Sequence, residues 1–256
     1  MLSFDLQGFG KNANKGSWFS IDSHIDDILK LLKILKQENP KKKIYLLGES
    51  MGGAIVLSLA NSKKNLPIDG IILVAPVIWN FTERNFFKSL TLNFFSKIFP
   101  SIKISGDGLI DVKASDNIKM LKQLSKDPYF IHKPTLESLN GIIKLMDKSF
   151  YDSQNYLKNP AYDTLMIIPI IDEIIPRKPL LELLNDKEVL KKFDDRIKLS
   201  IYEKNYHMIL RDINGNRVTR EIKEWIFKNK NLDYFYSFQN SLTKLRNSEF
   251  HHRLDK

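Results

Sequence analysis

The segment Gly48-Glu49-Ser50-Met51-Gly52 stands between an apolar run that ends at Gly48 and a helical pattern over residues 50–62. A chain that passes directly from a strand into a helix must turn sharply, and a serine at such a turn takes a strained backbone conformation. Side chains two positions before and two positions after the serine would collide with the turn, which is a steric reason for Gly48 and Gly52. The segment therefore predicts a strand, a tight turn that exposes a serine hydroxyl, and a helix.

Strands and helices are expected to alternate along most of the chain. Apolar runs predict strands over residues 43–48, 70–77, 165–171 and 196–202, and helical periodicity predicts helices over residues 50–62, 179–193 and 218–228. This alternation is typical of a parallel sheet with helices on both faces. The predicted fold class is therefore α/β.

One long segment interrupts the alternation between the second and the third predicted strand. It carries six phenylalanines up to residue 100 and then helical patterns over residues 114–125 and 136–151. We interpret residues 80–160 as a helical cap inserted into the core. Residues 1–79 and 161–229 are then the two parts of that core, and residues 230–256 form a polar C-terminal tail.

Ser50 becomes a nucleophile only if a base takes its proton and a carboxylate orients that base. In folds with this kind of turn, the chain order is serine, acid, histidine. His207, directly after the fourth predicted strand, has the required position and is the candidate base. The other histidines precede the serine or lie in the predicted cap or tail: His24, His132, His251 and His252.

The candidate carboxylate is Asp172, because open parallel sheets place functional groups at the carboxyl ends of their strands. Glu173 and Asp163 are the alternatives. The predicted helix after Ser50 directs its first N–H groups and a partial positive charge toward the serine, so the backbone N–H of Met51 is the candidate oxyanion donor.

Several further segments resemble the monoacylglycerol lipase and lysophospholipase group of α/β-hydrolases: Asp69–Trp79, Ala114–Leu121, Asp127–Ile131, Asp172–Pro176 and Tyr206–Asp212. The resemblance runs from about residue 2 to residue 228. It implies an α/β-hydrolase fold, the catalytic triad Ser50, Asp172 and His207, and a helical cap over an acyl-chain pocket. Such enzymes use no metal and no organic cofactor, so we expect neither here.

The function that the resemblance implies is a serine hydrolase that cleaves carboxylic esters of lipid-like substrates through an acyl-enzyme on Ser50. The expected substrate-binding residues are aromatic: Trp79, Phe81, Phe86 and Phe87. The alternative for these aromatics is that they pack the cap onto the core. Because the same triad serves other acyl groups, a peptidase or a thioesterase is also considered.

The resemblance further implies an N-terminally truncated chain. Phe4–Gly10 is similar to the segment that closes the family's fourth strand, so the first three strands and a loop with a second oxyanion donor are expected to be missing. Residues 2–5 would then lack their usual neighbour beside residues 44–47. Pro169 stands where the family usually has glycine, and proline suits only a sheet edge or a bulge. The alternative function is therefore an impaired or inactive remnant of such a hydrolase.

The chain carries 40 basic and 30 acidic residues, for a net charge of +10. Its lysines are scattered and no groove-reading motif is present, so we expect no nucleic-acid partner, whereas peripheral contact with an anionic membrane fits the charge. The absence of cysteine excludes disulfides, thiolate metal sites and cysteine nucleophiles. No apolar run reaches the ~20 residues that cross a bilayer, and the expected localisation is cytoplasmic or peripheral to the membrane. The oligomeric state, acyl length and head group stay open.

Overall fold

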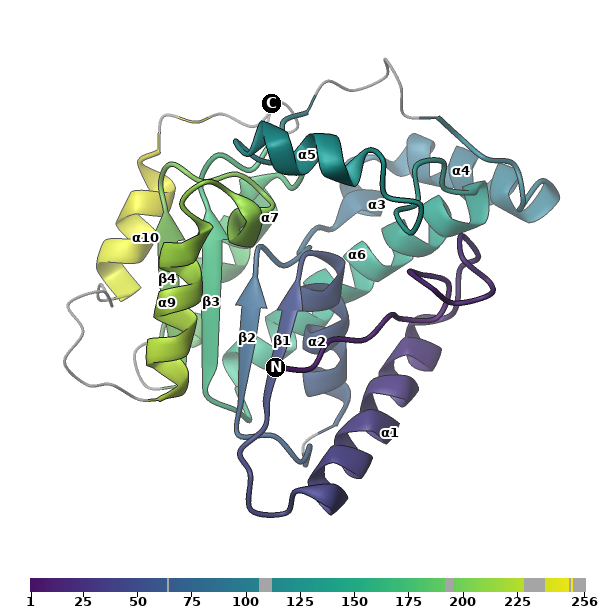
Figure 1. Cartoon of the computed structure of the whole chain (residues 1–256). Helices are drawn as coiled ribbons and strands as arrows, with labels where there is room; N and C mark the ends of the chain where they lie inside the picture. Colours follow the sequence, from purple (N-terminus) through teal and green to yellow (C-terminus); the bar gives the residue numbers. More distant parts are fainter. Residues whose placement is uncertain (64, 106–111, 192–195, 228–237, 249, 251–256) are drawn as a thin grey trace.

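A four-stranded parallel sheet carries the fold (Figure 1). The computed structural model describes every residue except 64, 106–111, 192–195, 228–237, 249 and 251–256. Within these residues the sheet has the order β1 (Tyr45–Glu49), β2 (Gly70–Val74), β3 (Thr164–Pro169), β4 (Ile197–Tyr202). The α/β class predicted from the alternation of strands and helices is confirmed.

The two inner strands, β2 and β3, are buried along their whole length. Continuous apolar runs of this kind are typical of parallel strands that are covered on both faces. Ile72 and Val74 of β2 pack with α9 (Gly215–Ile226), whereas Ile71 and Leu73 pack with the helices of the other face. Those helices include α1 (Ile21–Glu38) and α2 (Met51–Ser62), which lie against each other.

The described part of the segment between β2 and β3 holds four helices: α3 (Phe81–Arg84), α4 (Phe86–Ile98), α5 (Ile118–Leu124) and α6 (Leu136–Lys158). The long helix α6 runs alongside α2 (Figure 1), and its residues Phe150 and Tyr156 are buried in the main core. Part of the segment that the sequence assigns to the cap thus covers one face of the sheet. The cap boundaries at residues 80 and 160 stay a prediction.

The remaining helices follow β3 and β4. They are α7 (Arg177–Leu184), α8 (Lys187–Leu190), the 3-10 helix η1 (Ile209–Arg211) and α10 (Phe238–Arg246). The helix expected over residues 179–193 is divided into α7 and α8, because Asp186 accepts hydrogen bonds from the N–H groups of Glu188 and Val189 and so begins a new helix.

Helix α10 lies beside β4 (Figure 1), in the segment that the sequence analysis assigns to a polar tail. Its Leu242 and Leu245 are buried, and the Ser241 hydroxyl donates to the Leu199 carbonyl oxygen at 2.8 Å. Two leucines three positions apart share one helix face, which is why a short, mostly polar helix can still pack on the sheet. His251 and His252, which the sequence places in the tail, lie outside the described residues.

Strand β1 lies at the outer edge of the sheet, and its outer side has no strand partner among the described residues. Residues 2–5 form no strand, and β1 pairs only with β2 in the described ranges. Leu47 of β1 is 39% exposed, and Leu2 and Phe4 are also exposed. No helix among the described residues is long and apolar enough to cross a membrane.

Candidate active site

Ser50 occupies the turn between β1 and α2 with a left-handed backbone conformation, φ 53° and ψ −118°. A positive φ is strained for any residue with a Cβ atom. The strain is held from both sides: the Ser50 N–H donates to the Val74 carbonyl oxygen at 2.9 Å, and the Ser50 carbonyl oxygen accepts from the Ala54 N–H at 3.2 Å. Sheet and helix together therefore fix the direction of the serine side chain.

The glycines of this turn have unequal roles. A Cβ atom on Gly48 would lie 2.5 Å from the Gly52 carbonyl oxygen and 2.7 Å from the Gly53 nitrogen, so glycine is required there. The steric reason that the sequence suggests for Gly52 is wrong, because a Cβ atom there would meet nothing within 4 Å outside the neighbouring chain and its own helix backbone. The second crowded position is Gly53, where a Cβ atom would lie 2.8 Å from the Pro76 Cβ.

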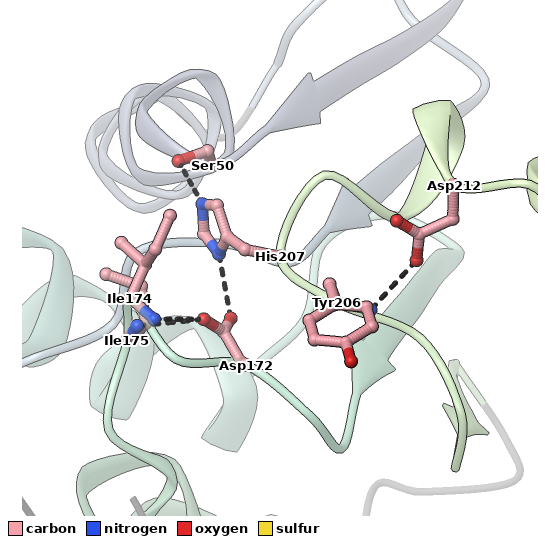
Figure 2. Close-up of polar contacts among 7 residues, drawn as sticks. All are labelled: Ser50, Asp172, Ile174, Ile175, Tyr206, His207 and Asp212. Atoms are coloured by element: carbon pink, nitrogen blue, oxygen red, sulfur yellow. Dashed lines mark hydrogen bonds and ion pairs between the residues drawn. The ribbon is translucent and has the colours of Figure 1, made fainter. Parts of the chain in front are cut away.

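His207 connects the two other candidates (Figure 2). Its Nε2 lies 2.8 Å from Ser50 Oγ, and its Nδ1 lies 2.7 Å from Asp172 Oδ2. The imidazole is only 4% exposed. Because a carboxylate can only accept, Nδ1 carries the proton of this hydrogen bond, which leaves the Nε2 lone pair for the serine hydroxyl. The three residues come from three loops at the carboxyl ends of β1, β3 and β4.

The second oxygen of Asp172 is held by the backbone. Asp172 Oδ1 accepts from the N–H groups of Ile174 and Ile175, both at 2.9 Å (Figure 2). One oxygen is thus held by two backbone donors, while the other is directed at His207. This division fixes the carboxylate plane relative to the imidazole.

Pro169, the last residue of β3, does not disturb this loop. The Ile167 carbonyl oxygen accepts from Ala75 N–H on the β2 side, and Ile170 N–H donates to the Tyr202 carbonyl oxygen on the β4 side, both at 2.9 Å. Successive residues of a parallel strand form hydrogen bonds to alternate neighbouring strands, so Pro169, two residues after Ile167, faces the β2 side. At this level of the sheet, β2 has already ended. The missing N–H therefore costs the sheet no hydrogen bond.

The alternative candidates lie elsewhere. The backbone N–H of Lys113 donates to Glu173 Oε2 at 2.9 Å. Asp163 lies at the opposite end of β3 and forms an ion pair of 3.6 Å with Arg196. His24 is buried on α1 between the rings of Phe9 and Trp18, and His132 contacts the Asp127 carbonyl oxygen at 3.2 Å. Of the candidate acids and histidines, the structure places Asp172 and His207 in a chain of contacts that reaches Ser50.

The candidate oxyanion donor is in the first turn of α2. Met51 is the first residue of this helix, and N–H groups of a first turn have no partner within the helix. The N-terminal end of the helix also carries a partial positive charge. The position therefore suits an anion that forms next to Ser50.

Two acidic residues at the site were not singled out from the sequence. Glu49 precedes the serine, and its buried Oε1 has no hydrogen-bond partner among the described residues. Burial raises the pKa of the Glu49 carboxyl, and the nearby positive charge of Arg211 is the largest effect that opposes this shift. Asp212 is buried near His207, where its Oδ2 accepts from the Tyr206 N–H at 2.8 Å. A lone acidic residue in a sequence carries no signal that it will be buried, which is why both were missed.

The four predicted substrate-binding aromatics fall into two environments. Trp79 is buried and lies edge-to-face on Phe81, with ring centroids 4.9 Å apart, and both pack in the main core. Phe86 and Phe87 of α4 are 57% and 80% exposed. Phe87 also contributes to an apolar groove of about 580 Å³ between α4, Ile104 and Leu136. Their role in substrate binding stays a prediction.

No group of three or more His, Asp and Glu residues that could hold a metal ion occurs in the described part of the chain.

The parallel sheet, its helices on both faces and the strained serine turn define an α/β-hydrolase fold. The chain belongs to the Hydrolase_4 family, described as serine aminopeptidase, S33, whose model matches residues 1–214. The predicted family and fold are thereby confirmed.

Curated relatives include phospholipase YtpA of Bacillus subtilis, which is 25% identical over 61% of this chain and 60% of its own length. The monoglyceride lipase of Rattus norvegicus is 23% identical over 88% of this chain and 73% of its own length. The chain therefore spans less than two thirds of the first relative and about three quarters of the second.

Solved structures share the fold. The monoacylglycerol lipase of Paleococcus ferrophilus aligns with a TM-score of 0.68 at 20% identity, over 87% of this chain and 81% of that one. A soluble variant of monoglyceride lipase from Saccharomyces cerevisiae, in complex with a substrate analogue, aligns with a TM-score of 0.69 at 20% identity, over 88% and 76%.

Proposed function

We propose that this protein is a serine ester hydrolase that acts on lipid-like esters, monoacylglycerols or lysophospholipids, with Ser50, His207 and Asp172 as its catalytic triad. The contacts of His207 carry the proposal. One ring nitrogen lies 2.8 Å from the Ser50 hydroxyl oxygen and the other lies 2.7 Å from the Asp172 carboxylate. This is the arrangement that activates a serine hydroxyl as a nucleophile.

The reaction follows from these contacts. Ser50 Oγ attacks the ester carbonyl carbon while His207 Nε2 takes the hydroxyl proton, and Asp172 stabilises the imidazolium that forms. Met51 N–H donates to the oxyanion of the tetrahedral intermediate. His207 then gives its proton to the leaving alcohol. A water molecule then gives a proton to the same nitrogen and attacks the acyl carbonyl carbon. His207 returns this proton to Ser50 Oγ as the bond between serine and acyl group breaks and the fatty acid leaves.

The substrate class rests on two observations. Relatives of this chain are named monoglyceride lipase and phospholipase, and the proposal extends that class of ester to this protein. The apolar groove on α4 offers a surface that suits an acyl chain, with Phe87, Leu92 and Phe95 in its lining. Phe86, exposed beside Phe87 on α4, is included with this surface, whereas the burial of Trp79 and the partial burial of Phe81 against the core favour a packing role for these two residues.

Contact with an anionic membrane is part of the same proposal. Helix α4 exposes apolar residues along most of its length, including Phe87, Leu90 and Phe94. Lys88 and Lys97 lie on the same helix, and the whole chain carries +10. An apolar helix face with lysines and a basic protein favour an anionic lipid surface, from which a lipid-like ester would be taken.

A slow or inactive hydrolase is the second candidate. Met51 N–H is the single oxyanion donor that we assign within the described residues, and the loss of one donor costs about 10²- to 10³-fold in rate. The same candidate is favoured by the edge position of β1, which pairs with β2 alone in the described ranges and so lacks the neighbouring strand that the family resemblance implies.

Covalent labelling separates the two candidates. The chain is treated with a fluorophosphonate probe and a series of short to long acyl esters, beside Ser50→Ala, His207→Ala and Asp172→Asn. Ser62→Ala, in the last position of α2, is the matched control. An aminoacyl amide in the same series tests the peptidase alternative.

We expect labelling that requires Ser50 and His207, and turnover that falls by about 10³- to 10⁴-fold in Asp172→Asn. Ester hydrolysis that survives Ser50→Ala would contradict the proposal. A chain that unfolds cooperatively but neither labels nor hydrolyses esters would favour the second candidate.

A further inference from the structure

Asp212 lies in the loop that carries His207 and is only 5% exposed. Four donors surround its carboxylate. Oδ2 accepts from Asn205 Nδ2 at 2.9 Å and from the Tyr206 N–H at 2.8 Å, which is the contact drawn in Figure 2. Oδ1 accepts from Ser115 Oγ at 2.6 Å and from the Asp116 N–H at 3.4 Å. A buried carboxylate with this many donors is strongly held and holds its partners in turn.

The two oxygens have different partners in the chain. Oδ2 holds the two residues that directly precede His207, so it fixes the backbone from which the imidazole extends. Oδ1 holds residues 115 and 116, which lead into α5 in the segment between β2 and β3. Asp212 therefore joins the histidine loop to a distant part of the chain.

Other hydrogen bonds join the same two segments. Met208 N–H donates to the Ala114 carbonyl oxygen at 2.8 Å. Asn117 Nδ2 donates to the Arg211 carbonyl oxygen at 3.0 Å, and the Ile213 N–H donates to Asp116 Oδ1 at 2.8 Å. Residues 114–117 and residues 205–213 thus form one hydrogen-bonded unit around Asp212.

The preceding residue extends this unit to the loop that carries Asp172. Lys113 donates its backbone N–H to Glu173 Oε2 at 2.9 Å. Its ammonium group lies 3.1 Å from the Tyr206 hydroxyl and 4.4 Å from the centre of the Tyr206 ring. Residues 113–117 therefore contact the neighbours of both His207 and Asp172.

We propose that Asp212 is a positioning residue for His207 and that it couples the imidazole to the placement of residues 113–117 and α5. The proposal rests on the proposed function, in which His207 is the base. Asp212 does not touch the reacting atoms and acts through the backbone at Tyr206. When residues 113–117 leave the loop, Oδ1 loses both donors, and the His207 backbone loses the support of the Met208 contact.

The main variant is Asp212→Asn. An amide has one acceptor oxygen and one NH₂ group, so it can accept on the side of Tyr206 or on the side of Ser115 but not on both. Ser115→Ala is the second variant, because it removes one donor from residues 113–117 and leaves the loop unchanged. Asp186→Asn is the matched control, since that aspartate also accepts backbone N–H groups but lies at α8.

Three quantities are measured: kcat, KM and the downfield proton resonance of the hydrogen bond between His207 and Asp172. For Asp212→Asn we expect kcat to fall by about 10- to 100-fold, as for a small misplacement of a catalytic group, with little change in KM. We expect Ser115→Ala to lower kcat by about five-fold. The downfield resonance is expected to weaken in both variants and to persist in Asp186→Asn, whereas a general loss of stability would leave it in the folded protein.

The outcomes separate this proposal from the proposed function. If Ser50→Ala and His207→Ala abolish turnover while Asp212→Asn retains the parental kcat and resonance, the positioning role is wrong and the function stands. If Asp212→Asn does not fold, Ser115→Ala decides, and an unchanged kcat and resonance in that variant overturn the coupling. Turnover that survives Ser50→Ala refutes the function itself.

Discussion

The carbonyl oxygen of Gly52 lies 2.5 Å from the position that a Cβ atom would take on Gly48. The converse does not hold, because a Cβ atom on Gly52 has open space around it. Two glycines that look equivalent in the sequence are therefore different in the folded turn.

This difference predicts opposite effects of two alanine substitutions. Gly48→Ala must displace backbone atoms of α2, so we expect the free energy of unfolding to fall by about 1–3 kcal/mol. Gly52→Ala is expected to leave it unchanged or to raise it by up to about 1 kcal/mol, since glycine is unfavourable inside a helix. Urea denaturation of both variants and of the parent measures the free energy of unfolding. Equal stabilities would show that the turn adapts to a side chain at residue 48.

The Glu49 carboxyl makes stability depend on pH. Burial raises its pKa, so it stabilises the fold when protonated, and that contribution is lost as the pH rises from its ordinary pKa of 4.5 through the raised value. We expect Glu49→Gln to be more stable than the parent at neutral pH, because it removes a buried charge. The advantage should shrink toward pH 4.5. Urea midpoints across this range are the measurement, and an advantage that is independent of pH would refute the explanation.

His24 makes stability depend on pH in the opposite direction. Neither ring nitrogen has a hydrogen-bond partner in the part of the chain that the structure describes, and burial lowers the pKa of the imidazole, with Asp27 opposing. The contribution of the neutral ring to stability is fully present above the ordinary pKa of 6.5. This contribution is lost as the pH falls from 6.5 through the lowered pKa, by up to about 1.4 kcal/mol per pH unit.

We therefore expect His24→Leu to remove the loss of stability below pH 6.5, as measured by thermal unfolding at several pH values. The control is His132→Gln, because His132 lies at the surface. A pH profile that is the same in His24→Leu and in the parent would contradict this role of burial.

The exposed face of α4 predicts lipid binding. Phe87 is 80% exposed and Phe94 is 57% exposed, so their replacement by serine should leave the fold intact. We expect the chain to sediment with vesicles of phosphatidylcholine and phosphatidylglycerol. The double variant should bind at least about 10-fold more weakly, because two large apolar side chains no longer enter the lipid.

The control for vesicle binding is Phe227→Ser, since Phe227 is 72% exposed at the end of α9, away from α4. Loss of binding in this variant as well would point to general adhesion of a basic protein. Equal binding to vesicles of phosphatidylcholine alone would remove the electrostatic part of the proposal.

The positions of the strands along the chain, the helix after Ser50 and the fold class could be predicted because their signals are local. An apolar run of five or six residues, or a 3.6-residue periodicity, is present in the sequence whatever the rest of the chain does. The predicted strands accordingly coincide with β1 to β4 except at their ends. Strand β2 is shorter than expected, since Ala75 turns the chain with a φ of 43°.

Features that depend on distant contacts could not be predicted in this way. Helix α10 is mostly polar, and only its position beside β4 explains why Leu242 and Leu245 are buried. The steric role assumed for Gly52 failed because it depends on which atoms surround one point in space. Whether Pro169 costs the sheet a hydrogen bond depends on where the neighbouring strand β2 ends, which the sequence alone does not show.

The sequence by itself indicated the family and the strands of the sheet, and it predicted Ser50, His207 and Asp172 as site residues from residue type, chain order and the family resemblance, with Glu173 and Asp163 as alternative acids. Only the tertiary structure decided that Ser50, His207 and Asp172, up to 157 positions apart, lie within hydrogen-bond distance. It also decided that Asp212 is buried between two segments of the chain. The physical reason is that periodicity encodes which face of an element is apolar, whereas the partners of a charged group are set by packing between elements that are remote in sequence.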